Sequence, residues 1–238
     1  MGFPFLFFRR FPVERRNIMA DIITETIELR KQLISAANIY KNNLAGQVYL
    51  YVYGEKCFEV AYMTSCFKHL TGVQSPLSAD SFYDNAKNAT LAEPQIQIGT
   101  YSKLRNAKKK IICMHQLPQL TKGLVCVVKE MNTATLIYKL GITNLEFTVG
   151  LTENLDFNGN KVNDWLIPRT LRVKDKAIDA AKDAEFVDFI FSKKATEDQY
   201  DTVCYAASDA TLPECVKPLL TDNLLSKYTT EIETRQPV

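Results

Sequence analysis

The amino-terminal part of the chain has the apolar pattern of a helix. Apolar side chains recur near the 3.6-residue helical period between residues 22 and 44. They are Ile23, Ile27, Leu33, Ile34, Ala37 and Leu44. The pair Asn42 and Asn43, followed by Gly46, is typical of a helix end. The pattern therefore predicts one amphipathic helix over 22–44.

Two runs rich in aromatic and β-branched residues follow, at 48–53 and 57–63, with a short turn-like segment between them. This is the pattern of a β-hairpin. Side chains alternate between the two faces of a strand, so Phe58, Val60 and Tyr62 share one face. We expect that face to pack against the first helix.

Less regular segments come next. Residues 65–76 predict a loop that carries His69. Ser78 is a suitable N-cap for a helix that would end near Ala89. Residues 94–100 predict a short extended piece, which a lysine-rich stretch and an apolar run follow.

After Gly123 the pattern changes to short strands separated by turns rich in Asn, Gly and Asp. The predicted strands are 124–129, 135–140, 145–151, 165–173, 186–192 and 201–205, and short helices are predicted at 177–184 and 219–227. Successive short strands without long intervening helices favour an antiparallel sheet. The sequence therefore predicts an α+β fold in one domain over 19–228, with amino-terminal helices packed on a mostly antiparallel sheet of about six strands.

The two ends of the chain are expected to lie outside this domain. The segment Glu14-Arg15-Arg16-Asn17 can be encoded by a string that contains a bacterial ribosome-binding sequence, a short step before Met19. We therefore expect residues 1–18 to be a translated leader, or disordered, in a gene of a bacterium or phage. Arginine codons other than AGG at 15 and 16 would contradict this. Residues 229–238 are expected to form a disordered tail.

Charge is unevenly distributed, although the net charge is only +2. From Lys103 to Lys129 there are seven Lys or Arg and no Asp or Glu, whereas from Ala177 onward there are twelve acidic and six basic residues. Such polarity suggests that the middle of the chain binds an anion. The alternative is that the basic stretch is an ordinary solvated face.

Several classes of protein are excluded. The six cysteines have no C-x-x-C spacing, which is typical of reduced thiols in a cytoplasmic protein. No run approaches the roughly 20 apolar residues of a membrane span. No nucleotide-binding loop or nucleophile elbow is present, and Cys66-x-x-His69 with Cys113-x-His115 matches no zinc motif. We expect no cofactor, no metal ion and no membrane contact.

One of the two histidines lies in a cationic setting. His69 follows Lys68 and precedes Gly72. A nearby ammonium group lowers the pKa of an imidazole, which suits a general base. Lys68 itself is a candidate contact for a substrate phosphate. The alternative is a histidine that caps local backbone groups, and His115, in an apolar segment, is interpreted as structural.

A second cationic group lies on a predicted strand. With a period of two, Leu171 and Val173 face the core, and Thr170, Arg172 and Lys174 share the opposite face. A hydroxyl, a guanidinium and an ammonium in one column can donate hydrogen bonds to phosphate oxygens. The alternative is an exposed edge strand whose charges prevent aggregation.

The order of these motifs resembles the fourth group of phage-associated barnase–EndoU–colicin–RelE-like (BECR) nucleases. The segments that carry the resemblance are Phe67-x-His69-Leu70-x-Gly72, Ser78-Ala79-x-x-Phe82-Tyr83, Tyr138-Lys139-Leu140-Gly141, Phe147-Thr148-Val149-Gly150-Leu151, Pro168-Arg169-Thr170-Leu171-Arg172 and Phe189-Ile190-Phe191-Ser192-Lys193-Lys194. The resemblance covers most of residues 38–206. It implies a BECR-like ribonuclease fold and a toxin or effector of a phage or mobile element.

The resemblance also implies cleavage of RNA without a metal ion. A base removes the proton of a ribose 2′-hydroxyl, the oxygen attacks the adjacent phosphorus, and a cyclic phosphate forms. In this mechanism His69 is the general base or acid, Arg169 and Arg172 clamp the phosphate, and Thr170 donates a hydrogen bond. Further candidate substrate contacts are Tyr138, Thr148 and Lys193. The motifs offer no evident second histidine or glutamate as acid partner.

The expected partner is therefore RNA, with tRNA as one candidate, and an immunity protein is a further candidate partner. Two alternatives use the same sheet without catalysis. One is a module that binds RNA or a host protein, and the other is a structural accessory protein of a mobile element. Toxicity of the wild type that is lost in His69→Ala would favour catalysis.

Overall fold

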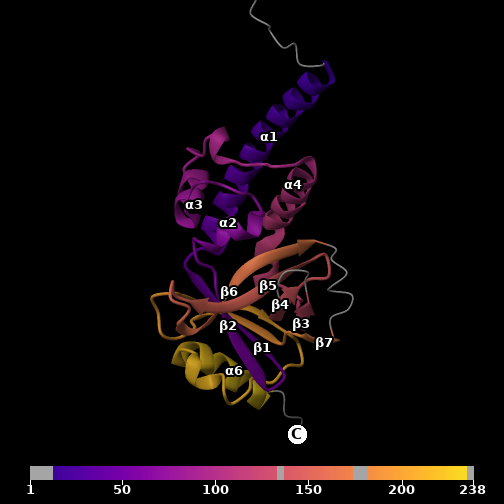
Figure 1. Cartoon of the computed structure of the whole chain (residues 1–238). Coiled ribbons are helices and arrows are strands. Elements are labelled where there is room, and N and C mark those ends of the chain that lie inside the picture. Colours follow the sequence, from indigo (N-terminus) through magenta and orange to yellow (C-terminus); the bar gives the residue numbers. More distant parts are fainter. Residues whose placement is uncertain (1–12, 133–136, 174–181, 235–238) are drawn as a thin grey trace, which may run out of the picture.

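A computed structural model describes residues 13–132, 137–173 and 182–234. Its helices are α1 (Val13–Asn43), α2 (Cys66–Thr71), α3 (Ala79–Lys87), α4 (Tyr101–Gln116) and α6 (Asp222–Thr234). Short 3-10 helices lie at Glu93–Gln95, Leu117–Thr121 and Lys217–Leu219. Helices α1 to α4 form a layer on one side of a sheet, and α6 lies on the other side (Figure 1).

The strands of the described residues form one nine-stranded sheet with the order β7-β3-β4-β5-β6-β2-β1-β8-β9. They are β1 (Gln47–Tyr53), β2 (Lys56–Ala61), β3 (Cys126–Asn132), β4 (Ile137–Thr143), β5 (Phe147–Leu155), β6 (Lys161–Val173), β7 (Lys182–Phe186), β8 (Phe189–Lys194) and β9 (Thr202–Ala206). All pairs are antiparallel except β2 with β6, which meet in parallel at Val60 and Leu166. Strand β6 pairs with β5 along its length, and α2 and α4 also contact β6.

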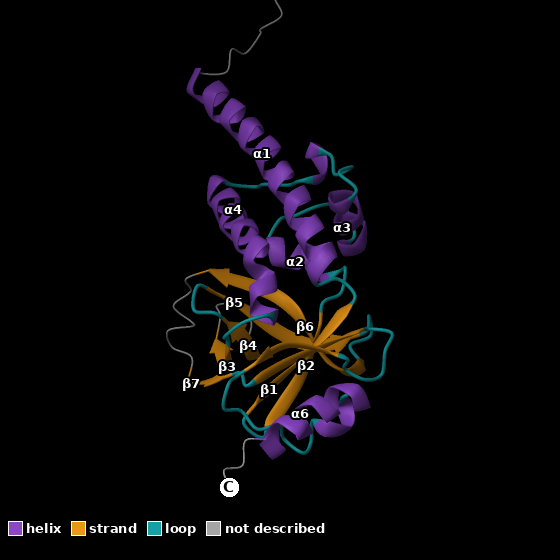
Figure 2. Ribbon diagram, turned by 180° about the vertical axis from the view of Figure 1, so that it is seen from behind, coloured by secondary structure: helices purple, strands orange, loops and turns teal. Residues whose placement is uncertain are grey.

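Two hydrophobic cores occupy the two faces of the sheet. On β1, Tyr49 and Tyr51 belong to the larger core beneath the helices, whereas Val48 and Leu50 belong to the smaller core beside α6. Figure 2 shows the helical layer and α6 separated by the sheet. A strand with both faces covered has no solvated face, which explains why β1 is apolar almost throughout.

The predicted α+β architecture is confirmed. The hairpin of β1 and β2 forms as predicted. Ser78 caps α3, since its Oγ accepts a hydrogen bond of 3.1 Å from the backbone N–H of Ser81. Leu171 and Val173 face the larger core, as the period of two predicts.

Several elements differ from their prediction. The segment 65–76, predicted as a loop, contains helix α2, because Phe67 and Leu70 anchor one short turn of helix in the core. Residues 182–184, predicted as the end of a helix, begin strand β7 because they pair with β3, while 177–181 lie outside the described residues. The sheet also has nine described strands rather than about six. At the ends, α1 begins at Val13 and α6 continues to Thr234.

Strand β6 contains a bulge at Arg169. Thr170 pairs with Gly150 and Pro168 pairs with Leu151, so Arg169 is an extra residue without a partner on β5. The bulge shifts the phase of the strand by one residue. Leu166 and Leu171 can therefore both pack against the larger core, although they are an odd number of residues apart.

The six cysteines are free thiols, and three of them, Cys66, Cys113 and Cys126, are buried. Of the helices in the described ranges, none combines the length and the apolar character that a membrane span requires.

Candidate active site

Helix α2 presents His69 toward solvent. Its buried residues are Cys66, Phe67, Leu70 and Thr71. Lys68 and His69 consequently lie on the outer side of the helix. The helix ends at Gly72, whose φ of 69° lies in the left-handed region that favours glycine. Packing of α2 beside β6 brings His69 close to the bulge of that strand.

The bulge residue Arg169 contacts His69, although the two are 100 positions apart in the chain. Arg169 Nη1 lies 2.9 Å from His69 Nε2. A guanidinium group can only donate, so Nε2 must accept this hydrogen bond with its lone pair. The imidazole is then neutral and carries its proton on Nδ1. Two of the motifs singled out in the sequence thus form one site.

The pKa of His69 is lowered from its ordinary value. The largest cause is partial desolvation of the ring by the surrounding protein, followed by the positive charges of Arg169 and Lys68. The direction agrees with the sequence-based expectation, but Arg169 contributes more than Lys68. His69 therefore remains neutral at physiological pH, which is the protonation state of a general base.

A cavity opens beside this histidine. Its lining consists of Lys68, His69, Gly72, Val73, Gln74, Ser75 and Gln97. The ammonium of Lys68 is directed at the loop that follows α2, where it donates to the carbonyl oxygens of Ser75, at 3.0 Å, and Leu77. Lys68 thus holds this loop in place and adds positive charge, while its hydrogen bonds go to the backbone.

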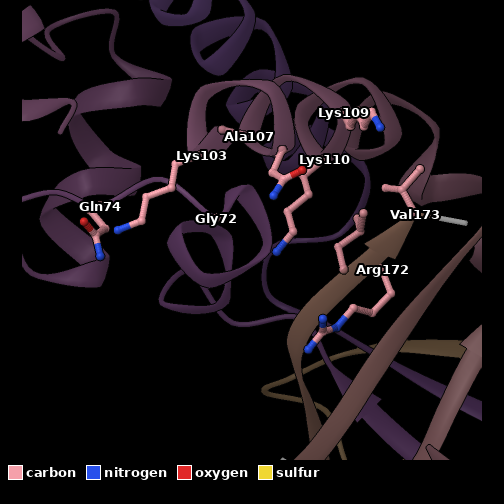
Figure 3. Close-up of a pocket in the computed structure, with 10 residues that line it drawn as sticks. Gly72, Gln74, Lys103, Ala107, Lys109, Lys110, Arg172 and Val173 are labelled. Atoms are coloured by element: carbon pink, nitrogen blue, oxygen red, sulfur yellow. The ribbon is translucent and has the colours of Figure 1, made fainter. Parts of the chain in front are cut away.

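A second, cationic cavity of about 400 Å³ lies between α4 and β6. Its polar lining comprises Gln74, Lys103, Asn106, Lys109, Lys110 and Arg172, together with Gly72 and three apolar residues. Lys103, Ala107 and Lys110 share one face of α4, since they are spaced four and three residues apart. In Figure 3, Lys110 extends from α4 and Arg172 from β6 toward the same space. Among the described residues that line the two cavities, none is Asp or Glu.

Gly72 explains how Lys110 reaches this place. A Cβ atom at position 72 would lie 3.0 Å from Cδ and 3.2 Å from Nζ of Lys110, so the lysine side chain passes directly over the glycine. Burial lowers the pKa of Lys110, and the positive charge of Arg172 lowers it further. The two cations are therefore close enough to interact.

The other predicted site residues lie elsewhere. Thr170 and Thr148 are buried on the sheet and line neither cavity, and Thr148 pairs across the strands with Arg172. Among the described residues, no hydrogen-bond partner faces Thr148 Oγ1. Tyr138 lies in β4, and its side chain is outside the described part of the structure, as is all of Lys174.

Lys193, predicted as a substrate contact, lies on the other face of the sheet. Its side chain is only 8% exposed, and its Nζ lies 3.5 Å from Glu59 Oε1. The same ammonium donates to the carbonyl of Asp198 at 2.9 Å and lies 4.6 Å from the centre of the Tyr200 ring. The structure thus places Lys193 in a buried ion pair beside the smaller core, away from His69.

Sequence reasoning missed the members of the cationic cavity on α4. In the sequence, Lys103 and Lys110 belong to a basic stretch in which neither stands out from its neighbours. Their helical spacing is a signal in the sequence, whereas the approach of Lys110 to Gly72 becomes visible only in three dimensions. Lys103, Lys109 and Lys110 thus add positive charge beside the His69 cavity, where the helices meet the sheet.

His115 has the structural role that its apolar setting suggested. Its Nδ1 lies 2.8 Å from the carbonyl oxygen of Ile111, and its Nε2 lies 3.1 Å from Ser35 Oγ, so it joins α4 to α1. Across the described ranges, no three His, Cys, Asp or Glu side chains gather in one group.

The fold and site together define a class, an α+β protein that holds a neutral histidine beside two cavities. The described residues of their lining include cations and no carboxylate, an arrangement suited to a phosphodiester. The chain belongs to the family described as phage-Barnase-EndoU-ColicinE5/D-RelE like nuclease4, whose profile matches residues 32–209. The resemblance carried by the sequence motifs is thereby confirmed. Comparisons with curated proteins and with solved structures found no match.

Proposed function

We propose that this member of a nuclease family cleaves RNA by metal-independent attack of a ribose 2′-hydroxyl on the adjacent phosphate. The contact between Arg169 and His69 carries the proposal, because it joins a neutral base to a phosphate-binding group at the mouth of a cavity. The basic cavity beside it supports a polyanionic substrate.

The steps follow from the roles of these groups. His69 accepts the proton of the 2′-hydroxyl through Nε2, and the resulting oxygen attacks phosphorus. The bond from phosphorus to the 5′-oxygen breaks, the 5′-oxygen takes up a proton from water, and a 2′,3′-cyclic phosphate remains. The hydroxide that water leaves behind accepts the proton from His69, which restores the neutral imidazole. Arg169 donates to the oxygens of the scissile phosphate as negative charge develops on them.

Arg169 has to move for this chemistry to begin. Its guanidinium occupies the Nε2 lone pair of His69 in the described structure, and that lone pair is the one that must take the proton. A substrate phosphate offers Arg169 a charged acceptor, which forms a stronger hydrogen bond than a neutral imidazole does. Binding of the phosphate therefore releases the base at the place where it is needed.

The same contact favours a second candidate function. A histidine whose lone pair stays occupied by Arg169 cannot act as a base, and the site would then bind RNA without cleaving it. Such a module would retain salt-sensitive binding, since its cations would still neutralise phosphates.

A cleavage assay separates the two functions. The protein is incubated with total tRNA and ribosomal RNA in EDTA, beside His69→Ala and Arg169→Gln. If the protein is a nuclease, we expect the wild type to cleave RNA and the cleavage rate of His69→Ala to be about 10²–10⁴-fold lower. Salt-sensitive binding by all three proteins without cleavage by any of them would instead support the binding module.

A further inference from the structure

The cationic cavity between α4 and β6 is distinct from the cavity at His69. Lys110 and Arg172 line the first, and His69 lines only the second. The two nevertheless share Gly72 and Gln74, so both open beside the turn that ends α2. A ligand larger than one phosphate can therefore contact both cavities at once.

The donors of the cationic cavity suit a phosphate group. Lys110 provides a compact ammonium and Arg172 a planar fork of N–H donors. Lys103, Gln74 and Asn106 add further donors around the same space. A phosphate diester has several acceptor oxygens and one negative charge, and it can satisfy such a mixed set better than a small halide ion can.

Lys110 supplies an independent observation. It is half-buried, and it makes no ion pair with any carboxylate of the described residues. Its neighbour Lys108, by contrast, pairs with Glu25. A cation that is partly desolvated next to a second cation gains stability when an anion binds, because the anion offsets both effects.

We propose that the cavity lined by Lys103, Lys110 and Arg172 binds the phosphate next to the scissile phosphate on the same RNA strand. The inference rests on the proposed function for its substrate. His69 and Arg169 contact the scissile phosphate, and the second cavity holds the neighbouring one. Arg172 thus positions the strand instead of sharing the scissile phosphate with Arg169.

This subsite has a defined kinetic consequence. A phosphate that does not react interacts equally in the ground state and in the transition state, so its loss raises KM and leaves kcat unchanged. A dinucleoside monophosphate contains only the scissile phosphate and cannot use the subsite. A trinucleoside diphosphate contains one more phosphate and can use it.

The test is a double-mutant cycle between protein and substrate. The protein change is Lys110→Met, which keeps the apolar stem over Gly72, and the substrate change is a neutral methylphosphonate at the flanking position of a trinucleoside diphosphate. Each change alone is expected to raise KM roughly tenfold, and the two together are expected to raise it little further. Additive effects, or an equal loss on a dinucleoside monophosphate, would overturn the subsite.

Lys227→Met is the matched control, because Lys227 is an exposed lysine on α6, across the sheet from the cavity. It should change neither KM nor kcat. Far-UV circular dichroism checks that Lys110→Met is folded, and Lys103→Met gives a second variant at an exposed position. In Lys103→Met, we expect KM to depend on the flanking phosphate in the same way but to a smaller extent. Fully additive effects of Lys103→Met and of the methylphosphonate on KM would also contradict the subsite.

A binding measurement tests the subsite independently of nuclease activity. A short 2′-O-methyl oligonucleotide cannot be cleaved by 2′-hydroxyl attack, so its affinity can be measured even if the protein has no nuclease activity. The slope of log affinity against log salt should become shallower by about 0.7 in Lys110→Met, as expected for one lost phosphate contact on a single strand. An unchanged slope would refute the subsite, whatever the result of the cleavage assay.

Discussion

At the scale of single residues, Arg169 helps to keep His69 in its neutral form. Its guanidinium lies at Nε2, and its charge is one cause of the lowered pKa of the imidazole, after desolvation and before Lys68. A base with a lowered pKa is active above that pKa and loses activity as the pH falls through it. The acid limb of the pH–rate profile should therefore lie below pH 6.5, the ordinary value for histidine.

Replacement of Arg169 by Met is expected to raise the pKa of His69 toward 6.5, because a nearby positive charge is removed while the ring stays in place. Titration of the histidine ring protons by NMR measures this pKa, and His115→Gln assigns the two signals. An unchanged or further lowered pKa in Arg169→Met would show that the contact does not control the imidazole.

Gly72 offers a second prediction at this scale. Gly72→Ala should lower the free energy of unfolding by about 1–2 kcal/mol, because φ is +69°. It should also weaken RNA binding, since the new Cβ displaces Lys110. Gly159→Ala is the control, because its φ is +83° and no atom lies within 4 Å of the added Cβ. Equal effects of both variants on RNA affinity would contradict the role given to Lys110.

At the scale of elements, the bulge in β6 aims Arg169 at α2. Deletion of Arg169 would restore regular pairing with β5, and then either Leu166 or Leu171 would have to leave the larger core. We expect a loss of several kcal/mol of stability from the deletion, whereas Arg169→Gln, at an exposed position, should change stability by less than about 0.5 kcal/mol. Urea unfolding measures both. Similar free energies of unfolding for the deletion and for Arg169→Gln would show that the bulge is not required for packing of the larger core.

The ion pair between β8 and β2 gives a contrasting prediction. Lys193→Met should lower the free energy of unfolding by about 2 kcal/mol, because it leaves Glu59 partly buried without its cation. It should leave the salt dependence of RNA binding unchanged. Lys194→Met, at a neighbouring side chain that is 69% exposed, should have almost no effect on stability. A shallower salt dependence of RNA binding in Lys193→Met would show that Lys193 contacts the RNA after all.

The sequence predicted those elements whose cause is local. The hairpin of β1 and β2 follows from two adjacent runs of strand-forming residues, and the start of α3 follows from the cap at Ser78. Helix α2 was missed because six residues are too few to show a helical period, and tertiary packing of Phe67 stabilises it. The bulge left no local signal, since it depends on which residue of β5 faces each residue of β6.

Prediction of the site had the same limit. His69, Arg169 and Arg172 are candidates from the sequence because their motifs are cationic and lie in recognisable segments. Lys110 is not a candidate from the sequence, because a lysine in a basic helix is usually solvated. Its position over Gly72 depends on the three-dimensional fold. Lys193 shows the opposite case, in which a cation in a matching motif lies in a buried ion pair.

At the scale of the whole molecule, the candidate site lies where the helical layer meets the sheet. Helix α2 contributes His69, α4 contributes Lys110, and β6 contributes Arg169 and Arg172. These segments are far apart in the sequence and lie side by side only in the fold (Figure 2). The described residues that line the two cavities include basic residues and no acidic ones, as in the basic stretch 103–129 of the sequence.

In the proposed reaction, a ribose 2′-hydroxyl activated by His69 is the nucleophile. The most direct measurement compares an RNA oligonucleotide that contains a mapped cleavage position with the same oligonucleotide carrying a single 2′-deoxy sugar there, in EDTA. We expect a 2′,3′-cyclic phosphate at the new end of the first, no cleavage of the second at that position, and loss of the cyclic product in His69→Ala. Cleavage of the 2′-deoxy position, or a product without a cyclic phosphate intermediate, would rule out the 2′-hydroxyl as the nucleophile.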